Sequence, residues 1–375
     1  MGNVQLGAGE ISPSQTIDAA PTAGGAAMEG GGAYNRHAHM QAAAGGIALP
    51  FLLEAAGAVD LAGGDEAICI ADYGASQGRN SLAPMRAVIA ALRARIGGAR
   101  PITVIHTDLP SNDFSALFQM LDTDPGSYLS ADPNVFAAAV GRSFYAAVLP
   151  PGHVTLGWSA QAVQWLSRLP APIPGHFHSL LADEPTRALF AAQSAADWRG
   201  FLSLRARELR PSGRLVVLQP ALGSSGRQGM ERLFQAIDDS LDALCAGGVI
   251  RAAEQARMAI ADWVRGRDEL LAPFAADGRF AHLAVTACEV LEAPDPGWVA
   301  YRENHDAHAL GERRAAFVRT TFAPSLGAAL DPDRGPDGRQ AFADALAAEV
   351  ARRVAADPHE IPQTASVIVL ERQAP

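Results

Sequence analysis

The stretch IADYGASQGRN, residues 70–80, decides the fold class. The apolar run of residues 67–71 ends at Asp72, glycines follow at Gly74 and Gly78, and a helical pattern begins after them. A buried strand, a tight glycine turn and a helix are typical of α/β sheets that bind ligands at the carboxyl ends of their strands. Glycines also let the backbone approach a ligand closely. We therefore expect a Rossmann-like sheet with a ligand site beside Asp72.

Short β-type runs alternate with helical patterns along the chain. They cover residues 67–74, 101–110, 152–159, 213–220, 281–292 and 365–373. This alternation predicts an α/β fold with a mostly parallel sheet, covered by helices through right-handed crossovers.

Two long segments interrupt that alternation, because residues 228–275 and 298–356 are helical by composition and carry no strand pattern. They predict a helical cap over the substrate pocket. Residues 1–27 lack periodicity, which predicts a disordered tail. The remaining ranges, 28–227, 276–297 and 357–375, then form the Rossmann-like core.

Charge and composition exclude several classes of partner. The net charge of −10 argues against binding nucleic acid or an anionic membrane surface. No apolar run reaches the ~18 residues that a membrane-spanning helix needs. The three cysteines are widely spaced, which favours reduced thiols and a cytoplasmic location. The chain contains no lysine and much alanine, and this bias favours a GC-rich bacterial source.

The glycine turn favours one kind of nucleoside cofactor. Its Gly74-x-x-x-Gly78 spacing is not the dinucleotide fingerprint, and a chain without lysine has no P-loop. S-adenosylmethionine carries no phosphate, and it needs acceptors for its amino group and ribose hydroxyls. Asp108, at the end of the next predicted strand, can accept both hydroxyls. The alternative is that Asp72 and Asp108 are ordinary turn and cap residues.

Several stretches in a fixed order carry a resemblance to a known family. They are MEGGGAYNRHAHMQ (28–41), IADYGASQGRN (70–80), IHTDLPSNDF (105–114), GRSFYAAVLP (141–150), SAQAVQWLSRLP (159–170) and, more weakly, RARELRPSGRLVV (205–217). In these stretches the chain resembles the SABATH methyltransferases, which methylate the carboxylates of salicylic, benzoic and jasmonic acids and, in caffeine formation, ring nitrogens. The resemblance implies the class I methyltransferase fold and S-adenosyl-L-methionine as cofactor.

The resemblance also implies a set of binding residues. Those implied for the cofactor are Asp72, Gly74, Asn80, Asp108, Leu109, Ser143 and Phe144. Those implied for the substrate are Tyr34, Gln41, Gln161, Gln164, Trp165 and Phe234. One position departs from the pattern, because Ala38 stands where the family usually has serine near the methionine end of the cofactor.

Two of these residues are expected to do the catalytic work. By the resemblance, the amide of Gln41 and the indole N–H of Trp165 hold the substrate carboxylate, and both donors are neutral. The alternative for Trp165 is an ordinary core residue on a helix over residues 160–169. Because Gln161 and Gln164 make one side of the pocket polar, we do not expect salicylate itself as the substrate.

The expected activity is therefore O-methylation of a small carboxylic acid to a methyl ester. No general base is needed, because carboxyl groups ionise near pH ~4. N-methylation of a heterocycle and a cofactor-binding protein without activity are the alternatives. We also expect a homodimer.

Other motifs favour weaker interpretations. GWSAQ, residues 157–161, resembles the nucleophile elbow of serine hydrolases but lacks its last glycine. Histidine pairs at residues 37 and 39, 176 and 178, and 305 and 308 have spacings that could bind zinc. We interpret them as ordinary loop histidines and expect no metal site.

Overall fold

A computed structural model describes residues 39–61, 66–223, 226–274 and 277–374, with side chains from residue 46 onward. Its strands are β1 (Ile68–Tyr73), β2 (Ile102–Asp108), β3 (Val135–Gly141), β4 (Val154–Ala160), β5 (Leu209–Pro220), β6 (Arg279–Phe280), β7 (Leu283–Ala293) and β8 (Gln363–Arg372). Its α-helices are α2 (His39–Ala58), α3 (Arg79–Ile96), α4 (Phe114–Thr123), α5 (Tyr128–Ala131), α6 (Glu184–Glu208), α7 (Glu231–Ala246), α8 (Ala252–Gln255), α9 (Arg267–Leu271), α10 (Pro296–Asn304), α11 (Ala307–Thr321), α12 (Ala323–Gly327) and α13 (Gly335–Ala356). Two short 3₁₀ helices are η1 (Ser179–Leu181) and η2 (Pro332–Arg334).

The strands form one sheet in the order β3-β2-β1-β4-β5-β8-β7-β6. The first five are parallel, whereas β8 runs antiparallel to both β5 and β7. This mostly parallel arrangement confirms the expected α/β fold.

Alternation along the strands builds a core on each face of the sheet. Ile68 and Ile70 of β1 pack in the cluster that contains α2, α3, α4 and α5. Cys69, Ala71 and Tyr73 point to the opposite face and join a cluster with α6 and α9. The connection from β3 to β4, residues 142–153, forms no helix on this second face.

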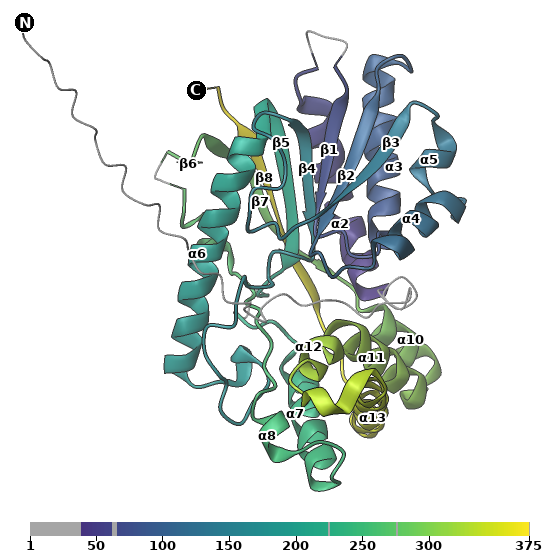
Figure 1. Cartoon of the computed structure of the whole chain (residues 1–375), viewed down its shortest axis with the longest axis vertical. Helices are drawn as coiled ribbons and strands as arrows, with labels where there is room; N and C mark the ends of the chain where they lie inside the picture. Colours follow the sequence, from purple (N-terminus) through teal and green to yellow (C-terminus); the bar gives the residue numbers. More distant parts are fainter. Residues whose placement is uncertain (1–38, 62–65, 224–225, 275–276, 375) are drawn as a thin grey trace, which may run out of the picture.

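Most helices of the predicted helical segments lie at one end of the sheet (Figure 1), whereas α9, which belongs to the segment 228–275, packs on the face of the sheet. Helices α7, α8, α10, α11, α12 and α13 gather below the sheet in that view, opposite the carboxyl end of β8. Because β8 is antiparallel to β5, these helices stand at the carboxyl ends of the five parallel strands. They share a second hydrophobic core with the segment after β4, and this core includes Phe177, Phe234 and Phe322.

Two features of the fold differ from the sequence-based expectations. Strands β3 and β6 were not predicted, since β3 is largely alanine and β6 is two residues long. The helix considered for residues 160–169 is wrong, because β4 continues to Ala160 and residues 161–178 contain no helix. Gln161 adopts a left-handed φ of 54°, which a helix does not allow.

Candidate functional site

The glycine turn after β1 is held open by backbone conformations that favour glycine. Gly74 and Gly78 both have φ of 85°. The N–H groups of Gly74 and Ala75 donate to the carbonyl oxygen of Thr107, at 2.8 and 3.1 Å. A Cβ atom on Gly74 would lie 2.4 Å from the Cβ of Ala162, which follows β4. The turn is therefore packed directly against the chain that leaves β4.

Asp108, at the end of β2, presents an ordered carboxylate beside this turn. Its two oxygens each accept one backbone N–H, from Ser76 and from Leu109, both at 2.7 Å. Burial raises the pKa of Asp108 to about 6, against the lowering effect of these two hydrogen bonds, and the charge of Asp72 adds to the rise. Since a carboxylate oxygen accepts more than one hydrogen bond, both oxygens can still accept ligand hydroxyls.

Asp72, at the end of β1, lies in a different environment from Asp108. Its Oδ2 accepts the hydroxyl of Ser81 at 2.6 Å and lies 2.8 Å from Nδ1 of His106. Nε2 of His106 in turn lies 2.8 Å from the hydroxyl of Tyr128. This buried network fixes the Asp72 carboxylate within the protein, where its interactions support the first turn of α3.

The other residues expected at the cofactor lie around the same turn. The ring of Phe144 would lie 3.5 Å from a Cβ on Gly74. Ser143 precedes it, and the Ser143 hydroxyl oxygen accepts the backbone N–H of Tyr145 at 3.2 Å. Leu109 is half-buried, as is Asn80 in the first turn of α3. The structure thus brings Gly74 and Phe144 together and places Asp108 beside the turn.

These features fit S-adenosylmethionine. Gly74 and Gly78 permit the left-handed conformations of the turn, and Asp108 beside it supplies two oxygens for ribose hydroxyls. The buried hydroxyls of Ser76 and Thr107 have no hydrogen-bond partner in the described part of the chain. Ser76, which also donates its N–H to Asp108, was not predicted from the sequence, although it lies between the two glycines.

Trp165, expected at the substrate, lies on a turn that is tied to the cap. The N–H of Leu166 donates to Ala261 at 2.7 Å, and that of Trp263 donates to Gln164 at 2.9 Å. Trp165 itself forms an isolated antiparallel bridge with Asp262. Within residues 46–374 as described, no acceptor is recorded for its indole N–H. The donor is thus positioned by the backbone and available to a ligand.

Gln161 and Gln164 lie on the same turn as Trp165. The amide of Gln164 donates to the carbonyl oxygen of Gln161 at 2.8 Å. The other amide atom, Oε1, is buried without a hydrogen-bond partner among the described residues. Gln161 has the left-handed φ noted above, and such conformations cluster at functional sites.

Phe234, on α7, lies inside the cap core. Its ring centroid is 5.7 Å from that of Phe322, and Phe322 is 6.4 Å from the ring of Trp165. His178 packs on Phe234 at 4.1 Å, and its Nε2 lies 2.7 Å from Asp262. Phe322 therefore contacts both rings and links Phe234 to the turn that carries Trp165.

The side chains of two expected substrate residues, Tyr34 and Gln41, are not described by the structure. Tyr34 lies outside the described residues, and so does Ala38. Gln41 lies in the first turns of helix α2, for which the backbone alone is described. Their expected roles stay predictions.

The residues of the two rival motifs make structural contacts. Ser159 is buried in β4, and its hydroxyl donates to the carbonyl oxygen of Tyr73 at 2.8 Å, so the nucleophile-elbow interpretation is wrong. His176 pairs with Asp238 at 2.7 Å. No group of three or more potential metal ligands occurs among the described residues. In the same part of the chain, no helix has the length and apolar character to cross a membrane.

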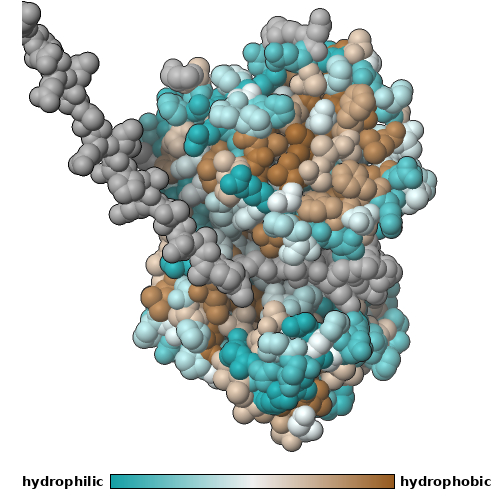
Figure 2. Space-filling model, viewed as in Figure 1, coloured by the Kyte–Doolittle hydropathy of each residue, from teal (hydrophilic) through white to brown (hydrophobic). Residues whose placement is uncertain are grey.

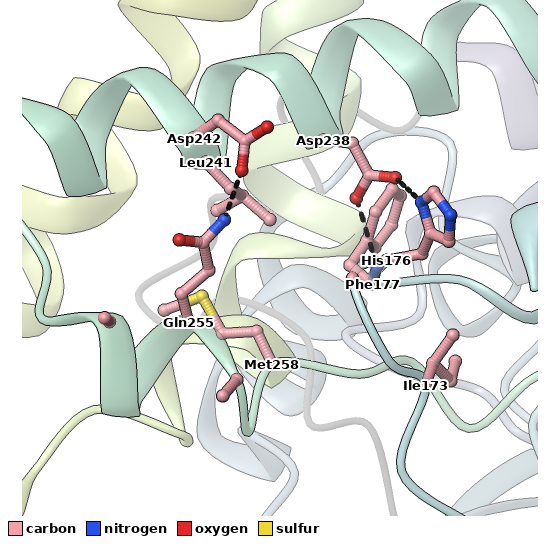
Figure 3. A pocket seen from close by; sticks show the side chains of 11 residues that line it. Ile173, His176, Phe177, Asp238, Leu241, Asp242, Gln255 and Met258 are labelled. Atoms are coloured by element: carbon pink, nitrogen blue, oxygen red, sulfur yellow. Dashed lines mark hydrogen bonds and ion pairs between the residues drawn. The ribbon is translucent and has the colours of Figure 1, made fainter.

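A separate cavity of about 260 Å³ lies in the cap (Figure 3). His176, Asp238 and Gln255 contribute polar groups, while Leu241 and Met258 contribute apolar surface. The polar groups are engaged with one another, since Asp238 also accepts the N–H of Phe177 at 3.0 Å and Gln255 donates to Asp242 at 2.6 Å. The cavity is distinct from the turn that carries Trp165.

Comparison with protein families matches residues 23–373 to the family described as SAM dependent carboxyl methyltransferase. The chain belongs to this family. The match confirms the resemblance to SABATH methyltransferases that the motifs of residues 28–220 carried.

Individual relatives agree with this family. Methyltransferase FUS9 of Gibberella moniliformis is 31% identical over 202 residues, 53% of each chain. Gibberellic acid methyltransferase 2 of Arabidopsis thaliana is 25% identical over 333 residues, 82% of this chain and 85% of the relative. The chain spans 53% to 59% of the length of three fungal relatives that it matches.

A solved structure supports the fold. The structure of loganic acid methyltransferase with SAH aligns with a TM-score of 0.74 at 21% identity, over 92% of this chain and 99% of that one. The two proteins therefore share their fold, including the sheet and the helical segments.

Proposed function

We propose that this protein is an S-adenosylmethionine-dependent methyltransferase that converts the carboxylate of a small acid into its methyl ester. The observation that carries the proposal is the contact between the two halves of the site. Ala162, on the turn that carries Trp165, packs against Gly74 of the cofactor turn. The Trp165 indole N–H, which has no acceptor among the described residues, thus belongs to a turn that packs on the glycine turn beside Asp108.

Methyl transfer to a carboxylate requires mainly that the protein aligns the two reactants. When bound, S-adenosylmethionine supplies an electrophilic methyl group on its sulfonium. Asp108 binds the ribose, and Trp165 together with Gln41 orients the carboxylate, which is already ionised at neutral pH. Alignment of this kind is worth up to about 7–11 kcal/mol in well-oriented cases. Neutral donors hold the carboxylate without a strong ionic bond that would weaken it as a nucleophile.

N-methylation of a heterocycle is the second candidate function. The buried Oε1 of Gln164 has no donor within the described residues, and a substrate with an N–H group would satisfy it. A third possibility is a protein that binds the cofactor without methylating anything. The products separate the three, because mild base cleaves a methyl ester but not an N-methyl group.

The decisive experiment removes one carboxylate donor at a time. We expect Trp165→Phe and Gln41→Ala to lower turnover on a carboxylic acid by about 10²-fold, because alignment is the main catalytic resource. Affinity for S-adenosylhomocysteine, measured by calorimetry, should stay within about twofold of the wild type.

The assay is a panel of small acids and heterocycles with labelled S-adenosylmethionine. A base-stable product would replace the carboxyl proposal by N-methylation. Bound cofactor with no product from the whole panel would favour the inactive binder, and failure to bind S-adenosylmethionine would refute all three.

We propose the following division of the chain. Residues 28–227, 276–297 and 357–375 form the cofactor-binding core, and residues 228–275 and 298–356 form a cap that encloses the substrate. The hydrophobic cluster around Phe234 supports this division, although Leu270 and Phe274 of the segment 228–275 pack with the sheet. Residues 164–166 belong to the core by sequence but bond to the cap segment through Ala261 and Trp263. The tail over residues 1–27 stays an expectation outside the described residues.

We further propose a homodimer in the cytoplasm. The edge strand β3 carries Phe136, of which 52% is exposed, and Phe118 of α4 is 42% exposed.

Free thiols at Cys69, Cys245 and Cys288 are consistent with a reducing compartment. A bacterial source rests on composition alone, since the relatives named above are fungal and plant proteins.

A further inference from the structure

The hydroxyl of Tyr145 connects the two halves of the site. Tyr145 follows Phe144 in the loop between β3 and β4, and the two rings pack edge to face with centroids 4.8 Å apart. The hydroxyl donates to the carbonyl oxygen of Trp165 at 2.7 Å, and the carbonyl oxygen of Val163 lies 3.3 Å away. One side chain of the cofactor-side loop thus bonds to the backbone of the substrate-side turn.

The remaining anchors of that turn come from elsewhere. Arg265, which is 1% exposed, donates to the carbonyl oxygen of Val163 at 2.6 Å and to that of Ser194 at 3.1 Å. The backbone bonds to Ala261 and Trp263 were described above. These anchors belong to the cap segment and α6. The Arg265 guanidinium also interacts with the Tyr145 hydroxyl, so the backbone bonds to Ala261 and Trp263 are the anchors that do not involve the cofactor-side loop.

We propose that Tyr145 is a positioning residue that couples cofactor binding to the orientation of the Trp165 indole. This inference rests on the proposed function and on the resemblance, which implies Phe144 as a cofactor-binding residue. A ligand that orders Phe144 also orders the Tyr145 ring packed against it, and the hydroxyl transmits that order to the Trp165 carbonyl. Burial raises the pKa of the Tyr145 hydroxyl, so it stays protonated and remains a donor at physiological pH.

The coupling has a thermodynamic consequence. If cofactor binding orders the turn of residues 161–166, the acid binds more tightly once the cofactor is present, and the effect is reciprocal. Couplings of this kind usually change affinity by about 5-fold or more. The preferred order is then cofactor first and acid second.

Hydrogen exchange of the peptide that covers residues 161–166 tests this without knowledge of the acid. In the wild type, S-adenosylhomocysteine should slow exchange there by about 5-fold or more. Tyr145→Phe keeps the ring and deletes the hydroxyl. It should leave affinity for S-adenosylhomocysteine within about twofold and reduce the slowing to less than about twofold.

Two further variants separate coupling from simple support. Tyr301→Phe, on α10, removes a hydroxyl far along the chain from the site, and it should behave as the wild type. Asp262→Ala removes the contact with Nε2 of His178 at 2.7 Å and so loosens the turn from the cap side. It should raise exchange with and without ligand while the ratio between the two stays near the wild-type value.

Three results would overturn the inference. They are an unchanged ratio in Tyr145→Phe, a Tyr145→Phe variant that behaves like Asp262→Ala, and a wild type whose turn exchanges at the same rate with bound ligand. A wild type that shows the coupling but esterifies no acid would instead refute the proposed reaction and leave the coupling standing.

Discussion

At the scale of single residues, the two strand-end carboxylates have separate tasks. Both Asp72 and Asp108 could be predicted from the sequence, because each ends an apolar run. The environments of the two carboxylates could not be predicted, because they depend on partners that are distant in sequence. Asp108 accepts two backbone N–H groups and faces the glycine turn, whereas Asp72 bonds to Ser81 and His106 inside the protein. Asp108 is therefore the stronger ribose ligand.

Replacement of Gly74 by alanine tests the shape of the cofactor turn. The new Cβ would combine a left-handed φ with a 2.4 Å approach to Ala162. We expect a loss of at least about 2 kcal/mol in unfolding free energy. Affinity for S-adenosylhomocysteine should also fall by more than tenfold, measured by calorimetry.

Gly97→Ala is a matched control for this substitution. Gly97 also has a positive φ, 69°, but a Cβ there would meet nothing within 4 Å. It should lose about 1 kcal/mol of stability and keep its cofactor affinity. Equal affinities in the two variants would show that contact with Ala162 does not shape the pocket.

The pKa of Asp108 predicts how cofactor binding depends on pH. Burial raises this pKa to about 6, so in the free enzyme the carboxylate loses its charge as the pH falls through that value. At pH 5 about one tenth of the molecules are ionised, and affinity for S-adenosylhomocysteine should be about tenfold weaker than at pH 7.5. Asp108→Asn should bind weakly with a flat profile from pH 5 to 7.5. A flat wild-type profile would remove Asp108 from the ribose site.

The same shift makes an opposite contribution to the stability of the free enzyme. Because the folded state favours the neutral form, the stabilising contribution of Asp108 is complete below its unfolded pKa near 3.8 and is lost as the pH rises through about 6. Cofactor affinity and free-enzyme stability should therefore respond to this residue in opposite directions.

At the scale of elements, strands with strong β-type residues could be predicted and the turn after β4 could not. Residues 160–169 have a helical pattern of apolar side chains. In the structure Gln161 takes a positive φ, and Gln164 and Leu166 bond to residues 261–263, about a hundred positions later. Long-range pairing therefore overrides local propensity, and it is this pairing that positions Trp165. The contact between Tyr145 and Trp165 spans 20 positions and is also absent from the local pattern.

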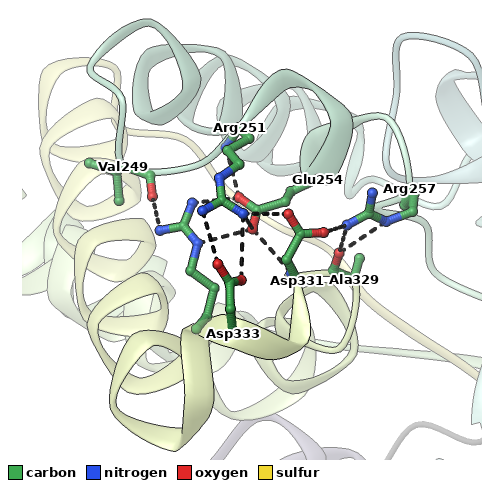
Figure 4. Close-up of polar contacts among 8 residues, drawn as sticks. Val249, Arg251, Glu254, Arg257, Ala329, Asp331 and Asp333 are labelled. Atoms are coloured by element: carbon green, nitrogen blue, oxygen red, sulfur yellow. Dashed lines mark hydrogen bonds and ion pairs between the residues drawn. The ribbon is translucent and has the colours of Figure 1, made fainter.

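In the cap, a cluster of charged side chains around Glu254 links α8 to the segment before α13 (Figure 4). Glu254 of α8 is fully buried and accepts backbone N–H groups from Arg251 and Asp331 and the guanidinium of Arg334. Burial acts to raise its pKa, but these hydrogen bonds outweigh it and lower the pKa to about 2. The stabilisation is therefore present above its unfolded value near 4.5 and is lost as the pH falls toward 2.

Glu254→Gln should release the cap without unfolding the sheet. Hydrogen exchange at neutral pH should become faster in α7, α8 and α13, because Arg334 loses a buried anionic partner. Exchange in β1, β2 and β4 should not change. Glu312→Gln is the control, since Glu312 is exposed and its recorded ion pair with His308 spans 3.9 Å. Equal acceleration in the sheet would show that the cap is not a separate unit.

At the scale of the whole molecule, the sheet leaves part of one face without a helix. The connection from β3 to β4 crosses that face as a loop, with Tyr145, Val148 and Leu149 packed on the cluster below. Figure 2 shows hydrophobic residues gathered over the region of β1 to β3, above the cap. The alternation of strands and helices predicted that helices cover both faces of the sheet. The connection of residues 142–153 without a helix could not be predicted, because β3 itself was not predicted from the sequence.

The edge strand β3 is the surface on which we expect two copies to meet. Its outer edge has no partner strand in the described sheet, and Phe136 is 52% exposed there. Two copies related by a twofold axis can bring such edges together and bury the exposed aromatic rings. Sedimentation velocity should then give twice the chain mass of 39.1 kDa for the wild type. Phe136→Glu should sediment as the single chain, because it places a charge in the apolar contact. Leu189→Glu alters a residue of α6 that is equally exposed, 52%, and should leave the dimer intact. A monomeric wild type, or a dimer that only Leu189→Glu dissociates, would rule out this interface.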